Sequence, residues 1–264
     1  MSSKSPNETV QAVEATFEIL SLIRERDVIT LSELADEVSM AKSTVHRHLR
    51  TLHDLHLVSH RDGEFRLGFE LLTLGEEARN RGEIFQLIEQ KVNEIGEQTG
   101  EKVQFMAEQD GIGYCIFRAR GGHAVDTEPF VGSRMPLHAT SAGKAVLAFL
   151  PDHRMREIIE RSLPKETPET VTEYESLRDE LDSIREQGYA VNHEEHIEGL
   201  NAIGAPVRKP DGGVVGAISV SGPTKRFEDD GYEGEIRSQL LGETNELELN
   251  IAHRRNEEDP QTFF

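Results

Sequence analysis

Apolar residues between positions 31 and 58 recur with the period of two short helices joined by a turn. The core-facing positions of the first helix are Leu31, Leu34, Ala35 and Val38. After a turn at residues 39–41, those of the second helix are Val45, Leu49 and Leu52. Residues three and four apart lie on one face of an α-helix, so each helix has one apolar face and one polar face. The pattern predicts a helix-turn-helix packed on a core.

The polar face of the second helix carries side chains suited to the DNA major groove. Ser43 marks the predicted N-cap region of this helix. Hydroxyl, imidazole and guanidinium groups can bind base edges and phosphates. The candidate DNA-binding residues here are Lys42, Ser43, Thr44, His46, Arg47 and Arg50. Two amphipathic helices can also form a protein–protein module, so the motif alone leaves that alternative open.

A hairpin signal follows directly. Two short runs of alternating apolar and polar residues flank Asp62 and Gly63, a pair typical of tight hairpin turns. A helix-turn-helix followed by a hairpin is a winged helix. Arg61 and Arg66 would then lie on the wing, near the phosphate backbone. The wing favours DNA binding over the protein–protein alternative.

The rest of the pattern predicts a linker and a second domain. Residues 1–9 are polar and expected to be disordered, and Val10, Val13, Phe17 and Leu20 space a helix that runs to about Arg26. An amphipathic helix at 69–81 needs a partner for its apolar side, either its own domain or the same helix of a second subunit. From Gly82 onward, strands and helices in mixed order with turn-linked neighbours predict an α+β domain with a mainly antiparallel sheet. The expected domains are a winged helix at 1–68, a linker helix at 69–81, a second domain at 82–255 and a flexible tail at 256–264.

The charge balance is unusual for a DNA-binding protein. The chain has a net charge of −20, and only 8 of its 29 basic residues are lysine. Residues 1–68 hold 8 basic and 11 acidic side chains, so most of the negative charge falls in residues 69–264. An acidic, lysine-poor surface is typical of a protein kept soluble in very high salt, where repulsion is screened. We favour this interpretation over that of an ordinary acidic cytosolic protein.

Several functional classes find no support in the sequence. There is no apolar run long enough to span a bilayer and no signal peptide, so we expect a cytoplasmic protein without a membrane partner. The single cysteine, Cys115, excludes an internal disulfide and a cysteine zinc site, and its apolar strand predicts an inert thiol. Neither a nucleophile elbow, a phosphate loop nor an HExxH motif is present. We therefore expect no catalytic residues and no cofactor.

Histidines could in principle ligate a metal. They stand at positions 46, 53 and 60, and at 193 and 196 beside Glu194 and Glu195. Histidine near carboxylate is a common zinc-ligand set. The first group falls on or beside the predicted recognition helix, where DNA or solvent is the better explanation. We expect no metal site.

Longer motifs in the correct order resemble the IclR family of transcription regulators. They lie at 31–35, 42–49 and 65–68 in the first domain, and at 135–150, 188–207 and 216–223 in the second. The resemblance covers nearly the whole chain. It implies a winged helix, a linker helix and a GAF-like α/β effector-binding domain, assembled as a homodimer or a dimer of dimers.

The resemblance also implies an effector site in a cup on one face of the sheet. In the family, backbone N–H groups at the start of the helix at 141 face small carboxylates and aromatic acids, as a helix N-terminus can. The positions that match effector-binding positions of the family are Met135, Ser141, Ala142, Asn192, Leu200, Ala202, Ser219 and Ser221. The family often has Asp where this chain has Asn192, and the neutral amide admits an anion or a sugar. Without the resemblance, the small residues at 217–222 would be read as close helix packing.

The sequence thus predicts a transcription regulator that reads a double-stranded operator and responds to a small effector. The effector classes expected are an organic acid, an aromatic acid or a sugar-derived metabolite. One alternative is a constitutive architectural DNA-binding protein with a purely structural second domain. The other is an enzyme that transforms a metabolite.

Overall fold

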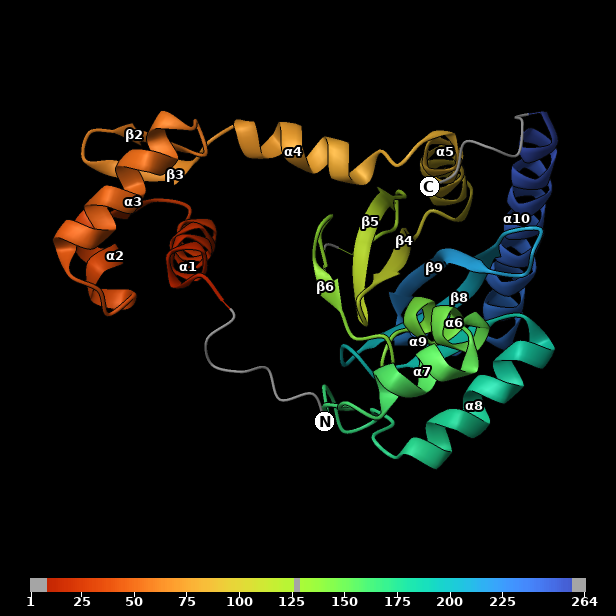
Figure 1. Cartoon of the computed structure of the whole chain (residues 1–264). Helices are drawn as coiled ribbons and strands as arrows, with labels where there is room; N and C mark the ends of the chain where they lie inside the picture. The colour runs from red at the N-terminus through yellow and green to blue at the C-terminus, as the bar shows by residue number, and fades with distance from the viewer. Residues whose placement is uncertain (1–8, 126–128, 258–264) are drawn as a thin grey trace. The chain divides into compact units, whose positions relative to one another are not determined.

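The computed structural model describes residues 9–125 and 129–257, so the disorder predicted at 1–8 and the tail at 258–264 lie outside the described residues. The chain forms two compact units, residues 1–81 and residues 82–264, which are treated separately (Figure 1). The last helix reaches Glu257, so residues 256 and 257 are helical rather than part of a tail.

The first unit contains four helices and a small sheet in its described part. In chain order its elements are α1 (Gln11–Arg26), β1 (Ile29–Thr30), α2 (Leu31–Glu37), α3 (Lys42–Asp54), β2 (Val58–Arg61), β3 (Glu64–Leu67) and α4 (Glu70–Arg79). The three strands pair antiparallel in the order β1-β3-β2. The two-residue strand β1 was not predicted, because it is too short to show a period.

Local sequence signals explain the helix-turn-helix and the hairpin. The side chain of Thr30 and that of Glu33 cap α2 reciprocally, which satisfies backbone N–H groups of its first turn. In α3, Val45, Leu49 and Leu52 are all at most 2% exposed, as the period predicts. Helix α3 begins at Lys42 after Ala41, which makes no side-chain cap bond, so the capping role expected near Ser43 is wrong.

Helix α1 has two apolar faces, and the first unit covers only one of them. Ile19 and Ile23 are fully buried, whereas Val13 and Phe17 are more than 60% exposed. Positions 17 and 19 are about 200° apart around a helix, which places the two pairs on opposite sides. Of the residues that predicted this helix, only Leu20 packs against the core, and Val10, Val13 and Phe17 are exposed.

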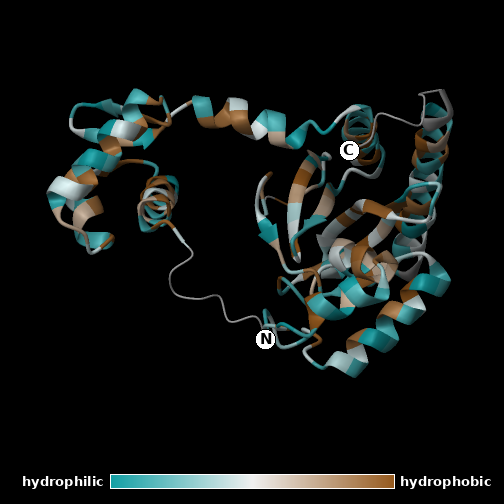
Figure 2. Cartoon of the chain, viewed as in Figure 1, coloured by the Kyte–Doolittle hydropathy of each residue, from teal (hydrophilic) through white to brown (hydrophobic). Residues whose placement is uncertain are grey.

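Helix α4 is also uncovered within the described structure. None of its residues is buried, Leu72 is 61% exposed and Leu74 is 52% exposed. Phe69, directly before the helix, is 91% exposed. Figure 2 shows hydrophobic residues along this helix beside hydrophilic ones. The apolar side that the sequence predicted thus has no partner within its own unit.

The second unit is a three-layer α+β domain. Its elements are α5 (Glu83–Thr99), β4 (Lys102–Gln109), β5 (Ile112–Arg120), β6 (Arg134–Met135), α6 (Ser141–Phe149), α7 (Asp152–Ile159), α8 (Tyr174–Gln187), β7 (Ala190–His193), β8 (Leu200–Arg208), β9 (Val214–Pro223), α9 (Thr224–Phe227) and α10 (Asp230–Glu257). Six strands pair antiparallel in the order β6-β5-β4-β9-β8-β7. The short elements β6 and α9 were not predicted.

Each face of this sheet has its own hydrophobic core. Helices α5 and α10 cover one face, where Ile88, Phe105 and Leu240 are buried. Helices α6 and α8 lie on the other side, in a core that includes Met106 and Leu177. Strand residues alternate between the two faces, and β4, β5 and β9 contribute buried residues to both cores.

A glycine lets helix α6 approach the sheet. A Cβ at Gly204 of β8 would lie 2.6 Å from the carbonyl carbon of Ser141 and 2.7 Å from the amide nitrogen of Ala142. Only glycine fits so close to a neighbouring backbone. The first turn of α6 therefore lies directly on strand β8.

Candidate nucleic-acid interface and ligand cavity

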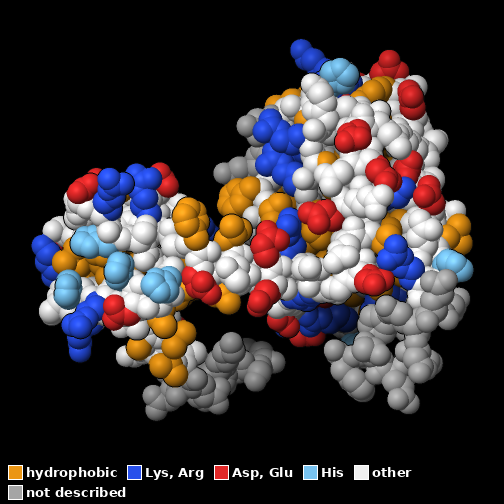
Figure 3. Space-filling model, turned by 90° about the horizontal axis from the view of Figure 1, so that it is seen from above, with side chains coloured by type: hydrophobic (Ala, Val, Ile, Leu, Met, Phe, Trp, Pro, Cys, Tyr) orange, Lys and Arg blue, Asp and Glu red, His pale blue; other side chains and the backbone are white. Residues whose placement is uncertain are grey.

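The polar face of α3 and the β2–β3 hairpin form one basic, histidine-rich surface. Thr44 is half-buried, and the other seven predicted DNA-binding residues are exposed: Lys42, Ser43, His46, Arg47, Arg50, Arg61 and Arg66. Figure 3 shows basic and histidine side chains gathered over the first unit. The turn of the hairpin has φ of 54° at Asp62 and 85° at Gly63, as its Asp-Gly sequence predicts.

A hollow of about 380 Å³ lies between α3 and the hairpin. His46, His53 and Arg50 of α3 line it, together with His60 of β2. The His60 ring stacks on Phe65 at 4.4 Å between centroids, which orients the imidazole at the base of the wing. On the other side of α3, the His48 Nδ1 and Thr16 Oγ1 atoms are 2.8 Å apart, a hydrogen bond that joins α3 to α1. Protein contacts thus fix the position of α3 while its polar face stays open.

The second unit contains a small, partly open cavity of about 50 Å³ between the sheet and the start of α6. Seven of the eight predicted effector positions line it: Met135, Ser141, Asn192, Leu200, Ala202, Ser219 and Ser221. Ala142 does not, because it packs into the core between α6 and the sheet. Its backbone nitrogen instead faces Gly204.

Sequence reasoning missed a further set of lining residues. These are Lys102, Gln104, Pro129, Thr140, His196, Ile197 and Asn201. Alternation along β4 places Lys102 and Gln104 opposite Val103 and Phe105, which was a usable signal for a polar face. It could not show that α6 covers that face, because the two segments are distant in sequence. A larger open hollow of about 440 Å³ shares Met135 and His196 with the cavity.

Strand register arranges the polar side chains on the cavity floor. Lys102 of β4 lies opposite Ser221 of β9. Two positions along, Gln104 lies opposite Ser219, and Ser219 lies opposite Gly204 of β8. Residues two apart on a strand point to the same face, so these side chains form two polar rows across the floor.

The start of α6 supplies donors at one end of this floor. Thr140 caps the helix by accepting a hydrogen bond from the Gly143 amide at 3.1 Å. The first N–H groups of a helix have no partner within it, which leaves those of Ser141 and Ala142 for other acceptors. The Ser141 hydroxyl is buried and has no hydrogen-bond partner among the described residues. A buried polar group of this kind is stabilised by an acceptor that enters the cavity.

Two further side chains set the polarity of the cavity. The Asn192 amide donates to the carbonyl of Ala139, which holds the side chain in place. An aspartate here would lack this donor and would place a charge beside a carbonyl oxygen. Burial lowers the pKa of His196, so the imidazole is neutral at pH 7. Its Nδ1 atom is buried without a hydrogen-bond partner in the described part of the chain.

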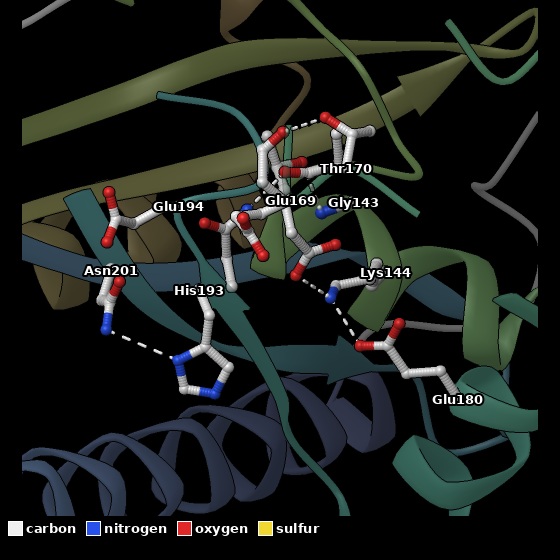
Figure 4. Close-up of polar contacts among 12 residues, drawn as sticks. Gly143, Lys144, Glu169, Thr170, Glu180, His193, Glu194 and Asn201 are labelled. Carbon is white, nitrogen blue, oxygen red and sulfur yellow. Dashed lines mark hydrogen bonds and ion pairs between the residues drawn. The ribbon is translucent and has the colours of Figure 1, made fainter. Parts of the chain in front are cut away.

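A buried lysine holds the segment that carries His196. Lys144 of α6 is fully buried, and its ammonium group donates to Glu180 of α8 at 2.5 Å and to Glu195 at 2.6 Å (Figure 4). Burial raises the pKa of Glu195, and the nearby Lys144 partly offsets this. The Thr170 hydroxyl also donates to the backbone carbonyl of Glu195 at 2.6 Å. One side of the cavity is therefore attached to both α6 and α8.

The structure also shows the surroundings of the single cysteine and of the candidate metal ligands. Cys115 is fully buried, and burial raises the pKa of its thiol to about 11, so it is inert at neutral pH. The described residues contain no group of three or more histidine, cysteine and acidic side chains arranged to hold a metal. Glu195, one of the carboxylates beside the histidine pair, binds Lys144 instead.

Two family models match the chain. The IclR helix-turn-helix domain matches residues 12–62, and the C-terminal domain of bacterial IclR transcriptional regulators matches residues 77–247. The chain belongs to the IclR family. This confirms the predicted resemblance and fold class.

Relatives and solved structures agree with this assignment. A probable transcriptional regulator, ArcR of Halobacterium salinarum, is 32% identical over 92% of this chain and 94% of its own length. KdgR of Escherichia coli is 33% identical over 86% of this chain and 87% of its own length. The Thermotoga maritima IclR crystal structure has a TM-score of 0.79 at 26% identity, covering 91% of this chain and 98% of its own. An IclR homologue of Microbacterium hydrocarbonoxydans complexed with 4-hydroxybenzoate has the same fold, with a TM-score of 0.76 at 23% identity, over 91% of this chain and 98% of its own.

This IclR-family chain is thus a transcriptional regulator with an N-terminal helix-turn-helix DNA-binding domain and a C-terminal effector domain. KdgR is named as a helix-turn-helix transcriptional regulator and ArcR as a probable one. Among the helices that the structure describes, none is long and apolar enough to cross a bilayer.

Proposed function

We propose that this regulator binds an approximately palindromic operator as a homodimer and changes its operator affinity when a small organic acid fills the cavity. The observation that carries the proposal is the cavity itself, which is lined by the start of α6, by Ser219 and Ser221, and by Ser141, whose hydroxyl has no partner among the described residues. A site with several donors around a buried space is suited to a small anion. We place the protein in the cytoplasm, where its DNA target lies.

The DNA contacts proposed are those of the exposed α3 face and the wing. Arg47, Ser43 and His46 are placed to reach base edges, because α3 turns its apolar residues into the core. Arg61 and Arg66 of the hairpin are placed to bind phosphates. This division follows the usual winged-helix arrangement, in which the second helix enters the major groove.

Two uncovered apolar surfaces support a homodimer. One is formed by Val10, Val13 and Phe17 at α1, and the other by Phe69 and the leucines of α4. Clusters of apolar side chains that are this exposed are typical of surfaces that bind another protein. We propose that a second copy covers them and that the α4 geometry sets the spacing of the two recognition helices. A ligand-induced change in that geometry would couple the cavity to DNA affinity.

Replacing both Ser219 and Ser221 by valine is expected to weaken the response to organic acids by about tenfold or more. Two hydroxyls that can bind a ligand are lost, each hydrogen bond being worth about 1 kcal/mol, while valine keeps the strand propensity; the Ser221 hydroxyl also loses its 3.4 Å bond to the Lys102 carbonyl. The measurement is operator binding by fluorescence anisotropy with a panel of pyruvate, glyoxylate, succinate and 4-hydroxybenzoate. Ser176→Val, at an exposed serine of α8 outside both hollows, is the matched control.

Operator affinity of the double variant without ligand should equal that of the wild type. A normal response in this variant would place the effector site elsewhere. If no member of a broad metabolite panel shifts the melting temperature or operator affinity of the wild type, the second domain is a scaffold and the ligand-responsive function is wrong.

We also propose that the protein is adapted to high salt, and expect it to be most stable in molar KCl. The screening length falls to about 3 Å at 1 M salt, which removes repulsion within a chain of net charge −20. Thermal melts and operator titrations from about 0.1 to about 3 M KCl test this over the range in which screening changes. A melting temperature that falls as salt rises, or operator binding confined to dilute salt, contradicts the proposal.

A further inference from the structure

Three histidines and an arginine line the hollow between α3 and the β2–β3 hairpin. His46, Arg50 and His53 are spaced four and three residues apart on α3, so they share one face of the helix. His60 of β2 lines the same hollow from the hairpin side. All four residues are exposed, and Figure 3 shows histidine side chains close together on this unit. The DNA contacts proposed above give no role to His53 or His60.

The base of the hollow is apolar and belongs to the domain core. Leu49 and Phe65 line it, and both are buried in the core of the first unit. His60 lies opposite Phe65 in the register of the hairpin, and the two rings stack at 4.4 Å between centroids. The His60 imidazole is thus held in place before any ligand binds, which lowers the entropy lost on binding.

The positive charge of this hollow depends on pH. Among the described residues that line it, none is acidic, and Arg50 is the one that is charged at every pH. An imidazole ordinarily takes up a proton between about pH 5 and about pH 8. The hollow can therefore hold from one to four positive charges across this range.

Other charged groups of the surrounding elements lie outside the lining. The acidic residues of α3 and the hairpin are Asp54, Asp62 and Glu64, and none of them lines the hollow. Helix α2 contributes Leu31 to the lining and no charged group. Of the other two histidines of this unit, His48 bonds to α1 and His56 lies in the turn after α3. The pH response of the hollow therefore belongs to the three histidines that line it.

A phosphate of the DNA backbone matches these groups. When α3 enters the major groove and the hairpin lies along the backbone, a DNA strand passes beside both elements. Guanidinium and imidazolium N–H groups bind phosphate oxygens through charge-assisted hydrogen bonds. A negative charge beside an imidazole also favours its protonated form. Phosphate binding in this hollow is therefore coupled to proton uptake.

We propose that the hollow between α3 and the hairpin binds a DNA backbone phosphate through Arg50 and the protonated imidazoles of His53 and His60, so that operator affinity falls as the pH rises. This rests on the proposed DNA interface and adds a phosphate site and a pH response to it. Arg50 binds the phosphate at every pH, and the two histidines contribute only when they are charged.

The test measures operator affinity by fluorescence anisotropy at about pH 6 and about pH 8, at constant ionic strength. The probe is a duplex selected from a random-sequence pool by the full-length protein. Each proton taken up on binding changes the affinity by up to about tenfold per pH unit, so we expect wild-type affinity to fall by about tenfold or more. The plot of log affinity against log salt concentration should also be steeper at the lower pH, by about 0.9 for each added phosphate contact.

Two double variants separate histidine charge from histidine shape. His53→Gln with His60→Gln should remove most of the pH response, whereas His53→Lys with His60→Lys should keep tight binding at the higher pH. His46 stays unchanged, because it is also placed at base edges. His153→Gln, at an exposed histidine on α7, is the matched control. If the double variants do not fold, His53→Gln alone, at an exposed helix position, should still weaken the response.

Equal wild-type affinity at the two pH values would overturn the inference. A full pH response in the glutamine variants would overturn it too, as would a response lost in His153→Gln. In each of these cases the proposed operator binding stands, because a selected duplex is bound. If the protein selects no duplex from the pool at either pH, the proposed function itself fails.

Discussion

Lys144→Met is expected to lower the free energy of unfolding of the effector domain by about 3–5 kcal/mol, because it leaves the buried Glu195 carboxylate without its counter-ion. Lys144 is fully buried, and its partner Glu195 is 8% exposed at the side chain. The loss should also loosen the segment that carries His196. All four tyrosines, Tyr114, Tyr174, Tyr189 and Tyr232, lie in this domain, and the chain has no tryptophan. Tyrosine fluorescence in a urea titration therefore reports on this domain alone.

The stability lost in Lys144→Met should become smaller as the pH falls. Burial already raises the pKa of Glu195, and removing Lys144 takes away the interaction that lowers it. Protonated Glu195 needs no counter-ion, so the deficit of the variant should shrink as the pH falls through the raised pKa of Glu195. Adding Glu195→Gln to Lys144→Met should recover part of the stability at pH 7. Lys165→Met, at an exposed lysine, is the control, and an equal loss there would refute the argument.

Arg47→Ala is expected to cost about 1–3 kcal/mol of operator binding in each half-site, if its guanidinium binds a guanine. In a dimer the loss occurs twice, about 2–6 kcal/mol in all, so the affinity should fall by about thirtyfold at least and by about four orders of magnitude at most. Anisotropy titrations with specific and random duplexes at fixed salt distinguish the loss of base recognition from the loss of non-specific electrostatic binding.

A second arginine variant controls for net charge. Arg156→Ala, at an exposed position on α7 of the effector domain, makes the same change in charge and should leave operator affinity unchanged. A folded Arg47→Ala protein with wild-type affinity would remove α3 from the DNA interface. Equal losses on specific and random DNA would instead make Arg47 a phosphate contact.

Elements defined by local signals could be predicted from the sequence. The core positions of α3 follow from the spacing of its apolar residues. The Asp62-Gly63 turn was predicted from this residue pair, which tolerates the left-handed φ that both residues adopt. Elements defined by distant contacts could not be predicted. Strand β1 exists because Ile29 pairs with Phe65, and which of the two apolar sides of α1 is buried depends on the domain core.

The same distinction between local signals and distant contacts applies to the residues of the candidate site. Family resemblance placed seven lining residues, including Asn192 and Ser219, but residue patterns alone would not have separated them from ordinary strand packing. Lys102 was missed because its cavity depends on α6, which lies about forty positions away. Glu195 was considered as a metal ligand, and only the fold shows that it binds Lys144, 51 positions away.

The two edge strands of the effector-domain sheet are short, which affects how readily the protein aggregates at high concentration. The edge strand β6 spans two residues, Arg134–Met135, and the opposite edge strand β7 spans four, Ala190–His193. Long exposed edges serve as templates on which further chains add strands and aggregate, and short edges remove most of that template. Where salt screens the repulsion between molecules, edge strands this short offer an added chain little to pair with.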